Sequence, residues 1–171
     1  MHCFIIAALS ADGFLAEKSN QNSTGWTSAE DTQFFKERTK QAGVVVMGRT
    51  TYETVGKPLP GRLNIIYSRQ TPGSGLPENL RYTQLAPQEL LEQLQAEGHS
   101  EVAICGGSSI YTQFMKAGVV DTLYLTIEPI LFGQGINLFT EPLGGKKLTL
   151  RKVSNLSSQT VLLEFSTSSQ V

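Results

Sequence analysis

The segment VVVMGRTTYETVGKPLPGRLNIIYSR, residues 44–69, decides the fold. Its first four residues are apolar without alternation, which is typical of a strand that is covered on both faces. Residues 49–51 then open a helical turn, and the prolines and glycines of residues 56–61 end it. Residues 63–67 are again apolar, so the segment predicts a strand, a short helix, a turn and a second strand.

The two expected strands of this segment end alike, in basic and hydroxyl-bearing residues. The first is followed by Arg49, Thr50 and Thr51, and the second by Ser68 and Arg69. The start of a helix offers free N–H groups and the positive end of the helix dipole, which suit an anion. The pattern fits a phosphate-binding edge, and it fits an ordinary connection with solvated arginines equally well.

The composition indicates one domain that spans residues 1–171, because 171 residues with 40% hydrophobic content suit a single core. The 14 basic and 15 acidic residues leave a net charge of −1, which favours neither nucleic acid nor an anionic membrane. Cys3 and Cys105 lie in apolar runs, as buried thiols of a reducing compartment do, and neither His2 nor His99 suggests a metal ligand. With no transmembrane run and no leader pattern, we expect a cytoplasmic protein without a metal site.

The beginning of the chain predicts a central strand followed by a long polar loop. Residues 3–9 form a continuous apolar run. Residues 10–25 are polar and have little to bury, and a loop of this length inside a compact domain is often an active-site lid. Phe14 and Leu15 are apolar members of this loop and could fold inward over a ligand.

An amphipathic helix is expected after the loop, with Thr27 or Ser28 as its N-cap. Four residues at the spacing i, i+3, i+4 and i+7 share one helix face: Asp31, Phe34, Phe35 and Arg38. A carboxylate beside two aromatic rings is costly unless it has a partner, so Asp31 is a candidate functional acid. The alternative is that Asp31 merely complements the helix dipole at the surface.

A second strand-to-helix joint follows residues 101–105. The strand runs directly into Gly106 and Gly107, and a helix is expected from residue 108 to about residue 117. The joint contains neither a GxGxxG fingerprint nor a Walker loop. Backbone without Cβ atoms beside a helix N-terminus lets a flat ring or a pyrophosphate approach closely, and a tight turn would explain the two glycines as well.

The remaining elements complete an α/β pattern. Residues 87–97 predict an amphipathic helix, and residues 121–127 alternate as a strand does. Residues 146–153 and 160–165 predict a closing antiparallel pair. The strand–helix alternation therefore predicts a largely parallel sheet between helices, with an antiparallel end. Irregular chain is expected at residues 70–78 and 166–171.

Together, these pieces resemble the dihydrofolate reductase family over nearly the whole chain. The resemblance rests on their order and spacing: Trp26, Asp31 and Phe35, then residues 47–69, then ICGGSSIYTQF at 104–114, then LYLT at 123–126. It implies an α/β, three-layer αβα fold with a mostly parallel mixed sheet of about eight strands and an antiparallel C-terminal hairpin.

A related reductase of riboflavin biosynthesis has the same fold, so the resemblance leaves two branches. SADGFLA at 10–16 and LFGQGINLF at 131–139 resemble the riboflavin branch, whereas PLPGR at 58–62 and Asp31 resemble the folate branch. The resemblance thus implies NADPH-dependent reduction of 7,8-dihydrofolate, with hydride transfer to pterin C6 and protonation of N5. The alternative is NADPH-dependent reduction of 5-amino-6-(5-phosphoribosylamino)uracil. Folate enzymes are usually monomers and riboflavin reductases dimers, so we expect a monomer, with a dimer as the alternative.

The resemblance also assigns the substrate site by position. Asp31 looks like the lone acid that pairs with the pterin 2-amino group and ring nitrogen, with Thr126 as its support and Phe35 packed on the substrate. Arg62 matches the arginine that clamps a carboxylate of the glutamate tail bidentately, which a lysine could not do. The implied catalytic residues are Asp31, Trp26 and Thr126, and the implied substrate-binding residues are Ile6, Asp31, Phe35, Arg62 and Thr126.

By the same resemblance the cofactor is NADPH, because basic residues at the phosphate edge would pair with its 2′-phosphate. Ala8, Leu15 and Trp26 would line the nicotinamide pocket, and Gly106 and Gly107 would lie beside the nicotinamide and pyrophosphate, joined by a cis peptide. The implied cofactor-binding residues are Ala8, Leu15, Gly48, Arg49, Thr50, Thr51, Ser68, Arg69, Cys105, Gly106, Gly107, Ser108, Ser109, Ile110 and Tyr111.

Four positions depart from the family pattern. Gly25 stands where proline is usual and should leave the lid looser, and Ser108 stands where a third glycine is common. Gln134 lies near where an acid often hydrogen-bonds the lid, which weakens the expected hold on a closed lid. Glu30 replaces a small residue before Asp31; it should point to solvent, and would otherwise raise the pKa of Asp31.

Overall fold

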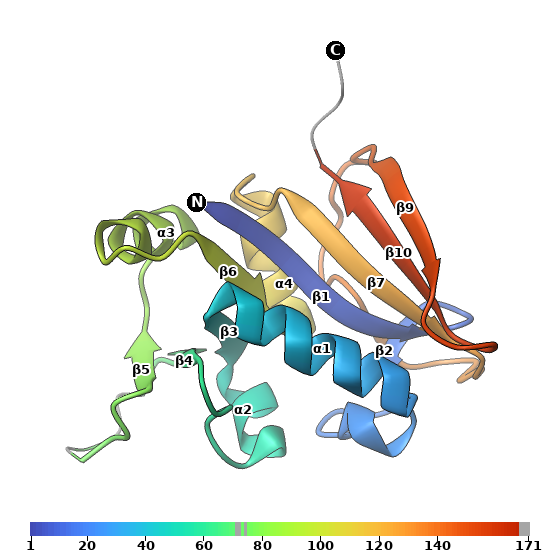
Figure 1. Ribbon diagram of the computed structural model, residues 1–171, viewed down its shortest axis with the longest axis horizontal. Coiled ribbons are helices and arrows are strands. Elements are labelled where there is room, and N and C mark those ends of the chain that lie inside the picture. The colour runs from blue at the N-terminus through green and yellow to red at the C-terminus, as the bar shows by residue number, and fades with distance from the viewer. Residues whose placement is uncertain (71–72, 74, 168–171) are drawn as a thin grey trace.

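The computed structural model describes residues 1–70, 73 and 75–167, so the irregular segments expected at 70–78 and 166–171 lie partly outside the described residues. Figure 1 shows a twisted sheet between helices, with α1 in front of the sheet and α4 behind it. The helices are α1 (Ala29–Ala42), α2 (Arg49–Val55), α3 (Pro87–Ala96), α4 (Ser108–Lys116) and the 3-10 turn η1 (Ser23–Gly25). Within the described residues, no helix is long and apolar enough to cross a membrane.

The main sheet has eight strands in the order β5-β4-β3-β6-β1-β7-β10-β9. Strand pairs from β5 to β7 are parallel, whereas β10 is antiparallel to both β7 and β9. This confirms the predicted three-layer α/β fold with an antiparallel C-terminal end. The strand bounds are β1 (His2–Ser10), β3 (Val44–Gly48), β4 (Leu63–Tyr67), β5 (Leu80–Thr83), β6 (Glu101–Ile104), β7 (Thr122–Glu128), β9 (Thr149–Asn155) and β10 (Val161–Ser166).

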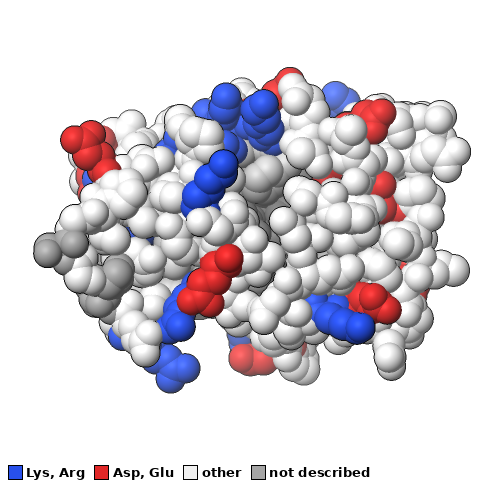
Figure 2. All heavy atoms as spheres, turned by 90° about the horizontal axis from the view of Figure 1, so that it is seen from below, with Lys and Arg blue, Asp and Glu red and all other residues white. Residues whose placement is uncertain are grey.

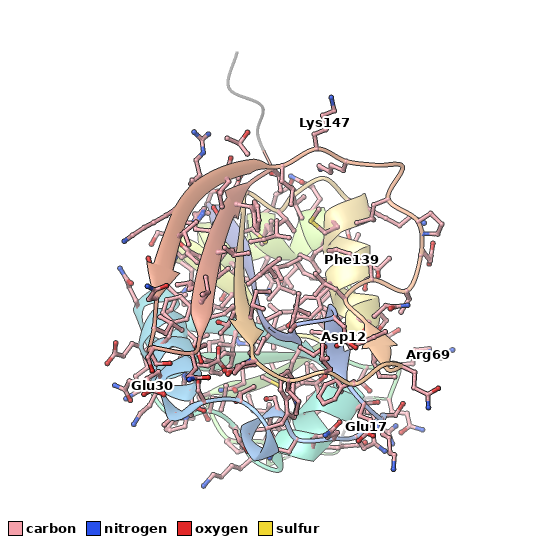
Figure 3. The ribbon with its side chains drawn as sticks, turned by 90° about the vertical axis from the view of Figure 1, so that its right-hand side faces the viewer. Asp12, Glu17, Glu30, Arg69, Phe139 and Lys147 are labelled. Carbon is pink, nitrogen blue, oxygen red and sulfur yellow. The ribbon has the colours of Figure 1, made fainter. Side chains whose placement is uncertain are left out.

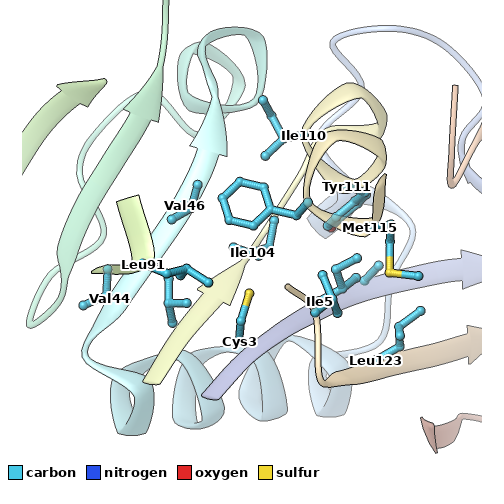
Figure 4. Close-up of a cluster of buried hydrophobic side chains, with 14 of the residues drawn as sticks. Cys3, Ile5, Val44, Val46, Leu91, Ile104, Ile110, Tyr111, Met115 and Leu123 are labelled. Carbon is cyan, nitrogen blue, oxygen red and sulfur yellow. The ribbon is translucent and has the colours of Figure 1, made fainter. Parts of the chain in front are cut away.

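Strand β1 shows why the central strands are continuous apolar runs. Successive side chains of a strand point to opposite faces of the sheet. Cys3 and Ile5 belong to the buried cluster formed with α3 and α4, part of which Figure 4 shows, whereas Phe4 and Ile6 belong to the cluster formed with α1. A strand that is buried on both faces has no polar side, so its sequence shows no alternation.

The loop expected at residues 10–25 contains structure that its composition does not predict. Strand β2 (Phe14–Ala16) pairs with β8 (Ile136–Asn137) in a separate two-stranded sheet. A Cβ at Gly135 would overlap the Ala16 carbonyl oxygen, so this close approach requires glycine. Strands this short show no periodicity, which is why polar composition alone indicated a loop.

Phe114 on α4 tests the packing of the hydrophobic core, because its side chain is fully buried there. Phe114→Ala should lower the free energy of unfolding by about 3–5 kcal/mol, since it removes apolar contacts and leaves a cavity. Urea unfolding followed by circular dichroism measures the change. Leu150→Ala, at an exposed position of β9, is the matched control. A loss no larger than that of the control would contradict the central place of Phe114 in the core.

Candidate active site

The residues assigned to the site come from elements that end at one edge of the sheet. Strands β1, β3, β4, β6 and β7 are parallel, so their carboxyl ends lie along this edge. The backbone N–H of Gly48 donates to the carbonyl oxygen of Gly106 at 2.7 Å, which ties the chain after β6 to the end of β3. Figure 2, seen from below, shows this side of the molecule hollowed between α2 and the segment that contains η1.

The first turn of α1 places the Asp31 carboxyl at this edge. Ser28 is the N-cap, and its Oγ accepts a hydrogen bond from the backbone N–H of Asp31 at 3.1 Å. Thr126 on β7 is buried, lies opposite Ala8 of β1, and hydrogen-bonds the Asp31 carboxyl, as the Thr27 side chain also does. The structure thus brings three of the assigned residues together.

Burial raises the pKa of the Asp31 carboxyl, and the charge of Glu128 raises it further, while the hydrogen bonds from Thr126 and Thr27 act in the opposite direction. The sequence pointed to Glu30 as the neighbour able to raise this pKa. Glu30 is exposed and lies at the outer surface at the start of α1 (Figure 3), so the effective charge is that of Glu128 at the end of β7. Sequence reasoning missed Glu128, because its partners are remote along the chain.

An apolar wall lies beside Asp31. Ile6 is almost fully buried, and Phe35 and Cys105 are partly buried against the same cluster. The Tyr111 hydroxyl donates to the Ile6 carbonyl oxygen at 2.8 Å, which braces β1 against α4. Burial raises the pKa of the Cys105 thiol to about 12, so it stays neutral. These groups form a surface suited to a flat, uncharged ring.

Arg62 is a buried cation, with only 6% of its surface exposed. Its Nη1 donates to Thr39 Oγ1 at 2.6 Å and its Nε to the Pro60 carbonyl oxygen at 3.1 Å. Burial lowers its pKa, and no carboxylate pairs with it in the part of the chain that the structure describes. A guanidinium in this state has N–H groups left for an anion.

Asn64 fixes the turn that carries Arg62, a role that the sequence analysis did not find. Its side-chain Nδ2 donates to the carbonyl oxygens of Leu59 and Arg62, each at 2.9 Å, and its Oδ1 accepts from the Leu59 N–H at 2.8 Å. Asn64 is fully buried within β4. The sequence signal that could have indicated this role is a polar residue inside an apolar strand.

Glycines let the starts of α2 and α4 approach each other closely. The peptide between Gly106 and Gly107 is cis, as the resemblance implied. A Cβ on Gly107 would lie 3.3 Å from Thr51 Oγ1, and a Cβ on Gly48 would lie 3.1 Å from Ile110 Cγ1. Ser108 and Ser109 open α4, so their backbone N–H groups have no acceptor within the helix. The joint therefore presents bare backbone and free donors.

Several polar side chains assigned to the cofactor already have partners. Ser108 Oγ donates to the Asn137 carbonyl oxygen at 2.6 Å, which ties α4 to β8. Arg49 Nε donates to Glu53 Oε1 at 2.6 Å, and its Nη1 donates to the side chain of Gln70. Ser68 Oγ also donates to Gln70, at its carbonyl oxygen. Thr50 and Arg69 are exposed, and Figure 3 shows Arg69 at the rim of the molecule.

Trp26 directly follows η1, whose segment borders the hollow on the side opposite α2. Its ring meets Phe132 edge-on, with centroids 5.2 Å apart. Its Nε1 is buried and has no hydrogen-bond partner among the described residues, so the site has a donor left to satisfy. Leu15 on β2 is partly buried against the core cluster of α4.

The raised pKa of Asp31 predicts a pH-dependent cost to stability. The folded state holds the Asp31 proton more tightly than the unfolded state, so stability falls as pH rises from the unfolded pKa through the folded pKa. Asp31→Asn should therefore raise the melting temperature at pH 7, and the gain should shrink as pH falls through the folded-state pKa of Asp31 and be nearly gone below about pH 4. Scanning calorimetry from pH 3 to pH 8 measures this. A gain that is independent of pH would show that ionisation of Asp31 is not its cause.

Comparison with known proteins shows which family this chain belongs to. A family model described as dihydrofolate reductase matches residues 3–130. The dihydrofolate reductase of Buchnera aphidicola subsp. Baizongia pistaciae (strain Bp) is 32% identical over 136 residues, which are 78% of this chain and 75% of that protein.

Two solved structures have the same fold. A provisionally named riboflavin biosynthesis protein of Shewanella sp. PV-4 superposes with a TM-score of 0.82 at 22% identity, over 97% of this chain and 98% of that one. A diaminohydroxyphosphoribosylaminopyrimidine deaminase/5-amino-6-(5-phosphoribosylamino)uracil reductase of Thermotoga maritima superposes with a TM-score of 0.78 at 16% identity, over 96% of this chain and 56% of that one. At these identities the likeness establishes the fold, whereas the family model spans most of the chain. The chain therefore belongs to the dihydrofolate reductase family and is a reductase of that type.

Proposed function

We propose that the chain reduces 7,8-dihydrofolate to 5,6,7,8-tetrahydrofolate with NADPH as the hydride donor. The observation that carries the proposal is the Asp31 carboxyl, half-buried beside an apolar wall and hydrogen-bonded by Thr126. No cation pairs with it in the described part of the chain, so its free acceptor positions are available to a substrate.

A pterin ring matches this arrangement. Its 2-amino group and adjacent ring nitrogen are a pair of donors, and a carboxylate accepts two parallel hydrogen bonds. Ile6 and Phe35 would pack on the flat ring. Reduction adds a hydride at C6 and a proton at N5, and the negative charge of the Asp31 carboxylate favours the protonated state of the bound ring.

Arg62 would hold the other end of the substrate. Dihydrofolate carries a glutamate tail with carboxylates, and the guanidinium binds a carboxylate with two parallel hydrogen bonds. Because Thr39 and Pro60 already orient Arg62, little side-chain entropy is lost when the tail binds. Asn64 holds the turn in the same orientation.

The residues at the α2 and α4 starts fit a dinucleotide. Gly106 and Gly107 leave the backbone bare, and the N–H groups of Ser108 and Ser109 can donate to phosphate oxygens at the positive end of α4. Thr50 in the first turn of α2 and Arg69 after β4 are exposed and suit a 2′-phosphate. When bound, NADPH supplies the hydride, and the protein supplies the orientation of the two rings.

Reduction of 5-amino-6-(5-phosphoribosylamino)uracil is the second candidate. It is favoured by the two motifs that build the β2–β8 pair, SADGFLA at 10–16 and LFGQGINLF at 131–139. Arg62 could bind a substrate phosphate as well as a carboxylate. Asp31 argues against this candidate, because reduction of a ribosyl group needs no acid beside a pterin ring.

The deciding experiment follows NADPH oxidation by absorbance with 7,8-dihydrofolate as the second substrate. We expect saturable turnover, and we expect Asp31→Asn to reduce kcat at pH 7 by about 10²-fold or more while NADPH still binds. Glu30→Gln removes the neighbouring exposed carboxylate and is the control. If NADPH is oxidised in the presence of 5-amino-6-(5-phosphoribosylamino)uracil but not in the presence of dihydrofolate, the second candidate is favoured.

Arg62→Leu tests where the glutamate tail binds. Loss of a charged hydrogen-bonded pair costs about 1.5–3 kcal/mol, so KM for dihydrofolate should rise by about 10–150-fold with a smaller change in kcat. Arg69→Leu is the contrasting variant and should raise KM for NADPH instead. If Arg62→Leu leaves KM for dihydrofolate unchanged, the tail does not bind at Arg62.

A further inference from the structure

A second carboxylate, that of Glu128, lies at this site and has no part in the function proposed so far. Glu128 is the last residue of β7, and only 3% of its surface is exposed. No cation pairs with it in the described part of the chain. A buried carboxylate without a cation needs hydrogen-bond donors or a favourable dipole to remain charged.

Three donors converge on the Glu128 carboxylate. The backbone N–H and the hydroxyl of Ser28 donate to Oε1 at 2.9 and 2.8 Å. The hydroxyl of Thr160 donates to Oε2 at 3.1 Å. The Ser28 oxygen in turn accepts from the backbone N–H of Asp31 at 3.1 Å. A single side chain therefore connects Glu128 to the residue that bears the active-site acid.

The start of α1 accounts for a buried charge without a cation. Ser28 is the N-cap of α1, so Glu128 lies at the positive end of the helix dipole, where a carboxylate is stabilised. Its position also makes it a like charge for Asp31, and Glu128 contributes to the raised pKa of that carboxyl after burial.

The other titratable groups around Asp31 do not supply this charge. Tyr111 on α4 faces Asp31, and burial holds its pKa well above the ordinary value, so its hydroxyl is neutral. Glu30 is the next acid along α1, and it is exposed. Thr126 and Thr27, which hydrogen-bond the Asp31 carboxyl, do not titrate.

We propose that Glu128 is a positioning residue of the reductase site: it fixes the start of α1 through Ser28 and keeps a negative charge behind the Asp31 carboxyl. The inference rests on the proposed function, in which Asp31 favours protonation of the bound ring. A carboxyl that faces a like charge keeps its proton to higher pH. The same negative charge raises the proton affinity of a ring bound at Asp31, so Glu128 extends the range of pH over which the protonated ring is favoured.

The direct test is a carboxyl ¹³C NMR titration of Asp31 in the whole protein without substrate. Glu128→Gln keeps an oxygen that accepts from Ser28 and removes the charge. We expect the Asp31 midpoint to fall by about one pH unit, the lower end of the effect of a nearby like charge. Glu30→Gln removes an exposed charge next to Asp31 in the sequence and should shift the midpoint by much less. An unchanged midpoint in folded Glu128→Gln would overturn the proposal.

Glu128→Asp separates charge from packing. It shortens the side chain and keeps the charge, so the Asp31 midpoint should stay closer to the wild-type value than in Glu128→Gln. If the two variants lower the midpoint equally, packing and not charge is responsible, and the proposal fails even where Glu128→Gln is poorly folded.

The pH dependence of hydride transfer to 7,8-dihydrofolate is the second readout. Glu128→Gln should move the fall in rate to lower pH by the shift that NMR records, about one unit, while Glu30→Gln leaves it in place. An NMR shift without dihydrofolate turnover in any variant would uphold the role of Glu128 and refute the proposed function. Turnover without an NMR shift would do the reverse.

Discussion

The Asp31 carboxyl lies beside apolar side chains and pairs with no cation among the described residues, and the contacts around it compensate for that constraint. The N-cap Ser28 fixes the turn that carries it, and Thr126 of β7 supplies a hydrogen bond from the sheet. The burial that raises the pKa of Asp31 also destabilises the folded protein at pH values above that pKa, where the carboxyl is charged. The same feature thus gives the site its chemistry and makes it a source of instability, as is common for functional groups.

The fold was predictable because the information for it is local. Apolar runs without alternation predicted β1, β3 and β6, and the interleaved helices predicted parallel pairing. Asp31 was found for the same reason, since a carboxylate on the aromatic face of a helix is visible in the spacing. Its neighbours Phe34 and Phe35 do pack against the cluster beneath α1.

The supports of the site were not predictable, because each depends on a contact between distant residues. Glu128 meets Ser28 across 100 positions of the chain, and Arg62 meets Thr39 across 23. Neither partner has a local pattern that differs from that of an ordinary surface residue. Asn64 is the exception, because its place inside an apolar strand is itself unusual. Local spacing therefore indicates the acid, and the family resemblance indicates the cation, but neither indicates what orients them.

The loop at residues 10–25 shows how such a contact changes an expectation drawn from sequence. Gln134 has no charge, although an acid was expected near this position to hold residues 10–25. Asp12, which lies within those residues, supplies a charge instead. The Asp12 carboxylate accepts from the backbone N–H groups of Gly133 at 2.6 Å and Phe132 at 3.2 Å. A hydrogen bond from Ser10, followed by these backbone bonds, lowers its pKa, so it stays ionised near neutral pH.

This contact lies between the two motifs that resemble the riboflavin branch, SADGFLA at 10–16 and LFGQGINLF at 131–139. Asp12 of the first motif holds Gly133 of the second, and Gly135 allows the second to lie against Ala16. Their joint occurrence is therefore explained by mutual packing. The two motifs report how the loop is held and do not choose between the substrates. Asp31, which pairs with no cation among the described residues, is the group whose chemistry would distinguish a pterin from a ribosyl phosphate.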